Sequence, residues 1–176
     1  MNRFVLAVVL LLGSPALWAA ETRDVAAFFD ETFGDFQEEL ANARDQGKQG
    51  ILLMFEMDDC PFCHRMKRNV LNHAEVQDYF REHFLIFSVD TEGDLEITDF
   101  AGETTTQKDF ALKQFRVRAT PVFQFVDLEG NPVKRGRYTG ATRDAGEFLL
   151  LGEYIVNGHN NEQSFTLYKR DKQAAM

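Results

Sequence analysis

The two cysteines of the chain, Cys60 and Cys63, follow an apolar run after a short polar corner and are separated only by Pro61 and Phe62. The run from Ile51 to Phe55 is continuous, which is typical of a strand that is covered on both faces of a sheet. Proline favours the first turn of a helix, where its missing N–H is not needed. The sequence therefore predicts a buried strand, a short polar corner, and a helix with Cys60 at its N-terminus.

The close spacing of the cysteines argues against a purely structural disulfide. A bond that closes such a small loop constrains the unfolded chain much less than a long-range bond does. Backbone N–H groups at a helix N-terminus favour a thiolate, so we expect Cys60 to ionise below the ordinary cysteine pKa of about 8.5. We expect Cys60 to be the nucleophile in disulfide exchange, and Cys63, one turn onward and more buried, to resolve the mixed disulfide.

Residues 1–20 have the three parts of a secretory signal peptide. Arg3 gives a positive start, Phe4 to Leu12 form an apolar core, and Ala16 to Ala20 form an exit rich in small residues. The alternative is an uncleaved membrane anchor, but the apolar stretch is shorter than the ~20 residues that a spanning helix needs. We therefore expect export to the periplasm.

The rest of the chain has the size of one domain. We expect a folded domain over residues 21–158 and a polar C-terminal tail over 159–176. The chain has 28 acidic and 19 basic residues and a net charge of −9. This excess of acid argues against nucleic acid or an anionic membrane surface as a partner, and it favours a soluble protein.

Helices and strands alternate along the predicted domain. The spacing of apolar residues predicts helices over 35–46, 74–83, 108–115 and 143–157. Apolar and alternating runs predict strands over 84–90, 120–127 and 133–139, of which the last two form a hairpin. Residues 91–107 contain two glycines and three consecutive threonines, and they are expected to form a polar insertion or long loop.

This order of elements, with Cys60 and Cys63 on one helix and Thr120-Pro121 opening a hairpin, resembles the thioredoxin superfamily over roughly Phe36 to Asn157. The chain is similar to bacterial periplasmic thioredoxin-like proteins, including the SoxW-like type that accompanies sulfur-oxidation enzymes. The resemblance implies an α/β thioredoxin fold: a central mixed sheet of four to five strands flanked by helices, with an insertion before the helix that precedes the cis-proline. It implies no cofactor.

The resemblance also implies how a protein substrate is held. Pro121 should be a cis-proline that faces the cysteines, and the backbone of Thr120 should pair with an extended substrate segment. Pro61 and Phe62 are expected to contact the substrate as well. The alternative is that Pro121 starts an edge strand in the trans form, a normal place for proline.

The motif departs from that of ordinary thioredoxin. The segment Asp59 to Cys63 replaces Trp-Cys-Gly-Pro-Cys, and Met54 stands where ordinary thioredoxin has a buried acid. Glu56 is a candidate for proton transfer to Cys63. The alternatives are that a water molecule takes this role, or that Glu56 is a solvated turn residue. Asp58 and Asp59 place negative charge near the thiolate, which should raise its pKa and offset part of the helix effect.

His64 completes the pattern Cys-x-x-Cys-His, which is also the attachment motif of a c-type haem. A haem electron carrier would need an axial ligand on a mainly helical scaffold, and Met66 is too close in sequence to supply it. The predicted strands also argue against haem. We expect His64 to be an exposed helix residue that adds positive character near the cysteines. A metal site is not expected, because a second pair of ligands at zinc spacing is missing.

The direction of electron transfer depends on the residues around the cysteines and on the size of the domain. Pro61-Phe62 resembles the residues between the cysteines of both glutaredoxins and DsbA-type oxidases. The chain lacks the long helical insertion of DsbA and the separate dimerisation domain of the isomerases. The SoxW-like resemblance and the nearby acids favour a reductase of partner-protein disulfides. Such a reductase would draw its electrons from a membrane thiol relay. A DsbA-like, disulfide-donating oxidase is the alternative.

Overall fold

Strand β1 (Gly50–Glu56) lies inside a four-stranded sheet with the order β2-β1-β5-β6. It is parallel to β2 (Phe84–Asp90) and antiparallel to β5 (Val122–Val126). Strand β6 (Pro132–Thr139) pairs with β5 in antiparallel fashion. The sheet is therefore mixed, and the predicted α/β thioredoxin fold is confirmed in its central sheet.

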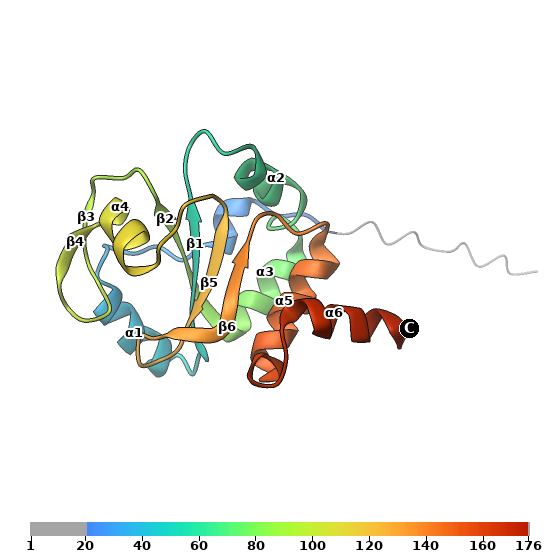
Figure 1. Cartoon of the computed structure of the whole chain (residues 1–176). Helices are drawn as coiled ribbons and strands as arrows, with labels where there is room; N and C mark the ends of the chain where they lie inside the picture. The colour runs from blue at the N-terminus through green and yellow to red at the C-terminus, as the bar shows by residue number, and fades with distance from the viewer. Residues whose placement is uncertain (1–20, 176) are drawn as a thin grey trace, which may run out of the picture.

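The structure is a computed structural model that describes residues 21–175, so the predicted signal peptide lies outside the described residues. The helices are η1 (Val25–Phe28), α1 (Phe36–Asp45), α2 (Pro61–Asn69), α3 (Ala74–His83), α4 (Gln107–Asp109), α5 (Ala145–Val156), η3 (His159–Asn161) and α6 (Phe165–Ala174). Helices α2, α3 and α5 pack on one face of the sheet, and α1 and α4 on the other (Figure 1). Within residues 21–175, no helix has both the length and the apolar character needed to cross a membrane.

The buried run in β1 explains why the sheet can carry helices on both faces. Leu52 and Met54 point into the cluster beneath α2, α3 and α5, where Phe148 also lies. Leu53 and Phe55 point into the cluster beneath α1 and α4. Side chains alternate between the two faces of a strand, so a central strand with two covers must be apolar at successive positions. This is the pattern that the sequence shows.

Local signals fix the start of α1. The side chain of Asp35 accepts hydrogen bonds from the backbone N–H groups of Gln37 and Glu38, both at 3.0 Å. This is N-capping, which satisfies N–H groups that have no partner within the helix. After the helix, Gly47 adopts a φ of 67°, a left-handed conformation that glycine takes without a steric penalty. The predicted helix over 35–46 is confirmed.

The predicted insertion at 91–107 contains regular structure. Strands β3 (Glu96–Thr98) and β4 (Thr104–Thr106) form a separate antiparallel pair. Thr98 also bridges to Asp35, and its N–H donates to the carbonyl of Gly34 at 2.8 Å. The expectation of a long loop is therefore incomplete, because the β-branched threonines favour strands and Ile97 is buried against the sheet.

The predicted helix over 108–115 is present, but its second half is wider than an α-helix. Helix α4 continues as a π-helical segment, η2 (Phe110–Gln114), and the N–H of Phe115 donates to the carbonyl of Phe110 at 3.3 Å. The rings of Phe110 and Phe115 lie 5.0 Å apart, and that of Phe115 lies 5.2 Å from the ring of Phe55. Packing of both rings against β1 accompanies the wider turn.

Residues 159–175 differ from the expected polar tail. Helix α6 packs on α5, and the rings of Phe165 and Tyr168 each lie 5.5 Å from the ring of Tyr154. Nζ of Lys169 lies 2.6 Å from Oε1 of Glu147 on α5. Few apolar residues carry these contacts, so the segment reads as polar although it is part of the folded unit.

Candidate active site

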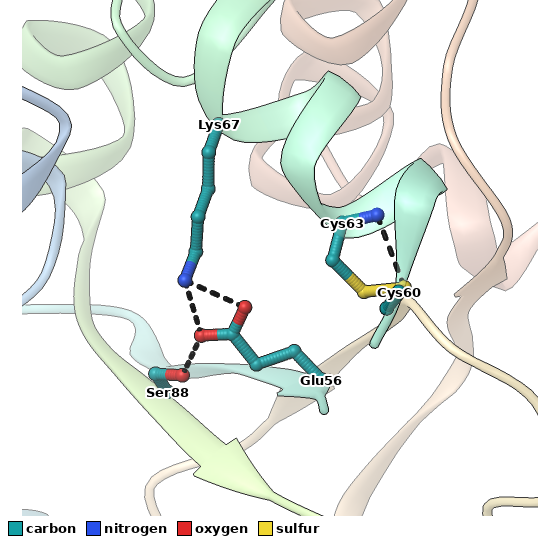
Figure 2. Close-up of a disulfide and its surroundings, with 5 residues drawn as sticks. All are labelled: Glu56, Cys60, Cys63, Lys67 and Ser88. Carbon is teal, nitrogen blue, oxygen red and sulfur yellow. Dashed lines mark hydrogen bonds and ion pairs between the residues drawn. A yellow bond between two sulfur atoms is a disulfide. The ribbon is translucent and has the colours of Figure 1, made fainter. Parts of the chain in front are cut away.

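The two cysteines form a disulfide at the N-terminus of α2, with their Cα atoms 5.2 Å apart. Cys60 is the N-cap residue, and Pro61 takes the first helical position. The backbone N–H of Cys63 donates to Sγ of Cys60 at 3.1 Å (Figure 2). The sulfur of Cys60 therefore occupies the place where an N-cap acceptor meets the free N–H groups of a helix.

Both cysteines are buried in the oxidised protein. Cys60 is 3% exposed and Cys63 is 1% exposed, so the expected order holds by a small margin only. The residues between them are exposed, and Phe62 is 57% exposed. Pro61 and Phe62 therefore form the exposed rim of the site, and the sulfurs lie below it.

The loop before β5 lies at the same end of the sheet as the disulfide. The Thr120–Pro121 peptide bond is cis. Val122, the first residue of β5, pairs with Phe55 near the end of β1, and the chain after β1 leads directly to Cys60. Pro121 is buried, its carbonyl accepts a hydrogen bond from the N–H of Gly140 at 2.8 Å, and Thr120 is half-buried. Thr120 and Pro121 therefore lie at the end of the sheet that carries the disulfide.

A groove of about 310 Å³ runs next to Thr120. Its walls come from Met57 in the loop before the motif, from the start of the insertion, from α4 with η2, and from the loop that ends at Thr120. Lys108 and Arg118 are exposed in it, and Glu92 is its only acidic residue. The groove is therefore more basic than the chain as a whole.

Glu56 makes an ion pair beneath α2. Nζ of Lys67 lies 2.7 Å from Oε1 and 2.6 Å from Oε2 of Glu56, whose side chain is 14% exposed. The hydroxyl of Ser88 on β2 donates to Oε1 of the same carboxylate. Figure 2 shows this group on the side of α2 from which the cysteines and Lys67 extend. Glu56 is therefore held at the disulfide end of the sheet rather than solvated in a turn.

Sequence reasoning identified Glu56 but missed Lys67 and Ser88. Lys67 follows Cys63 by four residues, so both side chains lie on one face of α2. Ser88 is the polar interruption of the apolar run in β2, and it pairs with the fully buried Met54 across the sheet. These two signals, a lysine one turn from a cysteine and a hydroxyl in a buried strand, could have found them.

The remaining predicted modulators are exposed. Asp58, Asp59 and His64 lie at the surface, and their side chains make no hydrogen bond or ion pair with any residue in the described part of the chain. The backbone N–H of His64 donates to the carbonyl of Cys60 at 3.1 Å. The side chains of these three residues therefore reach the cysteines through no hydrogen bond or ion pair in the described part of the chain.

A cysteine pair at a helix N-terminus, beside a cis-proline loop at the end of a mixed sheet, defines a thiol–disulfide oxidoreductase site. A family model described as the thioredoxin-like domain matches residues 36–155, and the chain belongs to this family. The match covers the disulfide, the cis-proline loop and both faces of the sheet. It also favours a redox role over haem attachment for Cys60, Cys63 and His64.

Several solved structures share the fold. A thioredoxin-fold protein from Helicobacter pylori is 19% identical, with a TM-score of 0.64 over 86% of this chain and 96% of that chain. A thioredoxin from Thermus thermophilus is 25% identical, with a TM-score of 0.54 over 69% and 84%. A Bacteroides thetaiotaomicron protein assigned as a disulphide isomerase is 27% identical, with a TM-score of 0.55 over 73% and 91%. No curated protein matches the chain in sequence.

Proposed function

We propose that the protein is a periplasmic thiol–disulfide oxidoreductase that reduces disulfides in partner proteins. The observation that carries the proposal is the Cys60–Cys63 disulfide at the N-terminus of α2. Similarity to a thioredoxin and to a protein assigned as a disulphide isomerase supports the same chemistry.

The reaction begins with the reduced protein. The Cys60 thiolate attacks one sulfur of the partner's disulfide, the partner's S–S bond breaks, and the leaving sulfur departs as a thiolate that takes up a proton. Cys63 then attacks the sulfur of Cys60, which releases the second partner thiol and forms the Cys60–Cys63 disulfide. Two electrons pass to the partner, so a dithiol must reduce the pair again. We assign that role to a membrane thiol relay.

We assign substrate binding to the end of the sheet that carries the disulfide. The backbone of Thr120, preceding the cis-proline Pro121, pairs with an extended substrate segment as an added strand would. Pro61 and Phe62 contact the substrate from the other side of the disulfide. The flanking residues of the substrate lie in the adjacent groove, where Arg118 favours acidic side chains.

Glu56 handles the proton of Cys63 in this scheme. A thiol must lose its proton before it can attack a disulfide. The carboxylate lies on the same side of α2 as Cys63 and is oriented by Lys67 and Ser88. It accepts the thiol proton directly or through a water molecule, while the side chains of His64 and Asp59 remain at the surface without a hydrogen bond to the cysteines.

The charges around the pair support the proposed direction of electron flow. Asp58 and Asp59 are exposed next to Cys60, and negative charge disfavours the thiolate of the reduced protein. A reduced form that is less stabilised makes the pair a better electron donor, the reverse of the situation in DsbA. This is why we favour a reductase over a disulfide-donating oxidase.

The location and the subfamily rest on the sequence. Residues 1–20 have the composition of a signal peptide, and the sequence from about Phe36 to Asn157 resembles SoxW-like proteins. Fractionation of cells that express the full chain, with N-terminal sequencing of the product, tests the location. Recovery of uncleaved chain in the cytoplasm would contradict it.

The reduction potential of the Cys60–Cys63 pair tests the direction. The protein is equilibrated with graded thiol buffers, and its free thiols are counted. We expect about −250 mV or lower, near the thioredoxin value of about −270 mV. A value near about −120 mV would instead identify a disulfide donor of the DsbA kind. In parallel, the reduced protein should cleave insulin disulfides and a Cys60→Ser variant should not.

A further inference from the structure

Phe33 is the most exposed large apolar residue of the described chain, at 107%. It precedes α1, and Leu95 from the insertion is exposed near it. Two hollows adjoin Phe33, and both include Phe33 and Thr32 in their walls. We call Phe33 and these two hollows the Phe33 surface. Exposed apolar groups that gather around hollows are typical of sites where another molecule binds.

The first hollow is apolar and measures about 280 Å³. Its walls include Phe36, Val89, Leu95 and Ile97, and it reaches the outer edge of β2 at Ser88. Val89, Phe36 and Ile97 are buried side chains of the core beneath α1, so the floor of the hollow is fixed by the fold. Its size and lining suit one large apolar side chain.

The edge of β2 offers backbone groups at this hollow. The N–H of Asp30 donates to the carbonyl of Ile86 at 2.8 Å, and the N–H of Ile86 donates to Oδ2 of Asp30 at 2.8 Å. The N–H of Asp90 donates to Oε1 of Gln107 at 2.6 Å. Alternate residues of a strand turn their backbone groups to the same edge, so Ser88 faces outward between these two contacts. Within residues 21–175, no group outside the sheet makes a hydrogen bond to the Ser88 backbone.

The second hollow is acidic and measures about 330 Å³. The acidic residues in its walls are Asp30, Glu31, Asp35, Glu38 and Glu39, and no basic residue lines it. Asp30 pairs with Arg81 and Asp35 caps α1, but Glu31 and Glu38 make no ion pair with any described residue. The field at this hollow therefore favours a positively charged group.

We propose that the Phe33 surface is a docking site for an extended, positively charged segment of a partner protein. A large apolar side chain of the segment fills the first hollow, a lysine or arginine lies over the second, and the segment's backbone pairs with Ser88 at the edge of β2. Because the two hollows share Phe33, one short segment reaches both. This docking does not depend on the proposed direction of electron transfer.

The test is a titration of ¹⁵N-labelled protein with a short acetylated peptide in which one phenylalanine is flanked by lysines. The peptide contains no cysteine, so binding is read independently of disulfide exchange. We expect chemical-shift changes centred on the amides of Gly34, Ser88 and Ile97, and an affinity that falls as salt is added. Matched peptides with serine in place of phenylalanine, or glutamate in place of lysine, should bind at least about tenfold more weakly.

Variants separate the surface from the rest of the protein. Phe33→Ser removes no buried contact and should weaken binding of the lysine peptide by about tenfold or more. Leu167→Ser, which removes an exposed leucine on α6, serves as the matched control and should bind as the unmodified protein does. Equal binding by Phe33→Ser, equal binding of the glutamate peptide, or shifts centred on another face would overturn the proposal. Insulin reduction by Phe33→Ser, measured in parallel, reports separately on the redox function.

Discussion

Lys67 holds both carboxylate oxygens of Glu56, at 2.7 and 2.6 Å, one helical turn after Cys63. The pair joins the end of β1 to α2, and Ser88 adds a bond from β2. Nζ of Lys67 also lies 5.8 Å from the centroid of the Phe29 ring, which fixes the lysine further. The carboxylate therefore has a defined position at the disulfide end of the sheet.

Replacing the lysine tests what this ion pair contributes. Lys67→Met leaves the largely buried carboxylate of Glu56 without its cation, and we expect the free energy of unfolding to fall by about 2 kcal/mol. Lys113→Met is the matched control, because Lys113 makes an exposed pair with Asp109 that should contribute only about 0.3–0.5 kcal/mol. Urea unfolding of both variants gives the comparison. Equal losses would mean that the Glu56 pair is an ordinary surface contact.

The order of attack predicts which variant traps a partner. In Cys63→Ala the mixed disulfide on Cys60 has no resolving thiol, so a covalent complex with a partner should accumulate. In Cys60→Ala the buried Cys63 should not form it. Mass spectrometry after mixing with a disulfide-containing peptide detects the complex. A complex that forms mainly with Cys60→Ala would reverse the assigned roles.

The basic groove predicts a preference among substrates. Arg118→Glu should slow reduction of a peptide disulfide flanked by aspartates by about fivefold, because a favourable charge contact worth roughly 1 kcal/mol becomes repulsive. Lys134→Glu makes the same charge change at an exposed residue of β6 outside the groove, and it should have little effect. The measurement is the rate at low substrate concentration. Similar slowing by both variants would indicate only a long-range charge effect.

The contact between α6 and α5 predicts a dependence of stability on pH. Burial raises the pKa of Glu147, but the hydrogen bonds from Lys169 and the Arg143 backbone, with both positive charges, outweigh burial and hold the pKa below its usual 4.5. A lowered folded-state pKa contributes stability above about pH 4.5, and this contribution is lost as the pH falls through the folded-state pKa.

Lys169→Met should therefore be less stable at neutral pH, by about 2 kcal/mol, and should lose less stability on acidification than the unmodified protein. Lys172→Met is the control, because Lys172 lies 4.0 Å from Glu153 in an exposed pair. Thermal unfolding between neutral pH and about pH 3 gives both slopes. Parallel curves for Lys169→Met and the unmodified protein would contradict a linked role for Glu147.

Two glycines of α5 should respond oppositely to the same substitution. A Cβ atom on Gly152 would lie 2.7 Å from the ring of Tyr79 and 2.9 Å from that of Phe80, so Gly152→Ala should cost about 1–3 kcal/mol. A Cβ atom on Gly146 meets only ordinary contact, and Gly146→Ala should gain about 0.5–1 kcal/mol from helix propensity. Chemical unfolding measures both. A gain at Gly152 would show that α3 and α5 can separate freely.

The elements that the sequence predicted well depend on local signals. Asp35 caps α1, Pro61 starts α2, and the apolar run of β1 is buried throughout. The cysteine pair was equally easy to identify, because its short spacing argues against a purely structural disulfide. Each of these features is determined by residues within one or two turns, so reading the chain in order is enough to find it.

The remaining features depend on contacts between distant residues. Helix α6 packs onto α5 through Tyr168 and Lys169. Neither residue indicates from the sequence that this polar stretch forms a packed helix. The Glu56 pair requires α2 to lie over the end of β1, which no local pattern states. The burial of Cys60 likewise results from the packing around it and not from the motif itself.

Backbone hydrogen bonds join the two ends of the β3–β4 insertion. The N–H of Lys108 donates to the carbonyl of Gly93 at 3.0 Å, and that of Gln107 to the carbonyl of Leu95 at 3.0 Å. A hairpin closed at its base can change in length and sequence at little cost to the sheet that carries it. Evolution can therefore alter Leu95 and its neighbours without displacing Cys60 and Cys63, so the choice of partner and the redox chemistry can diverge independently.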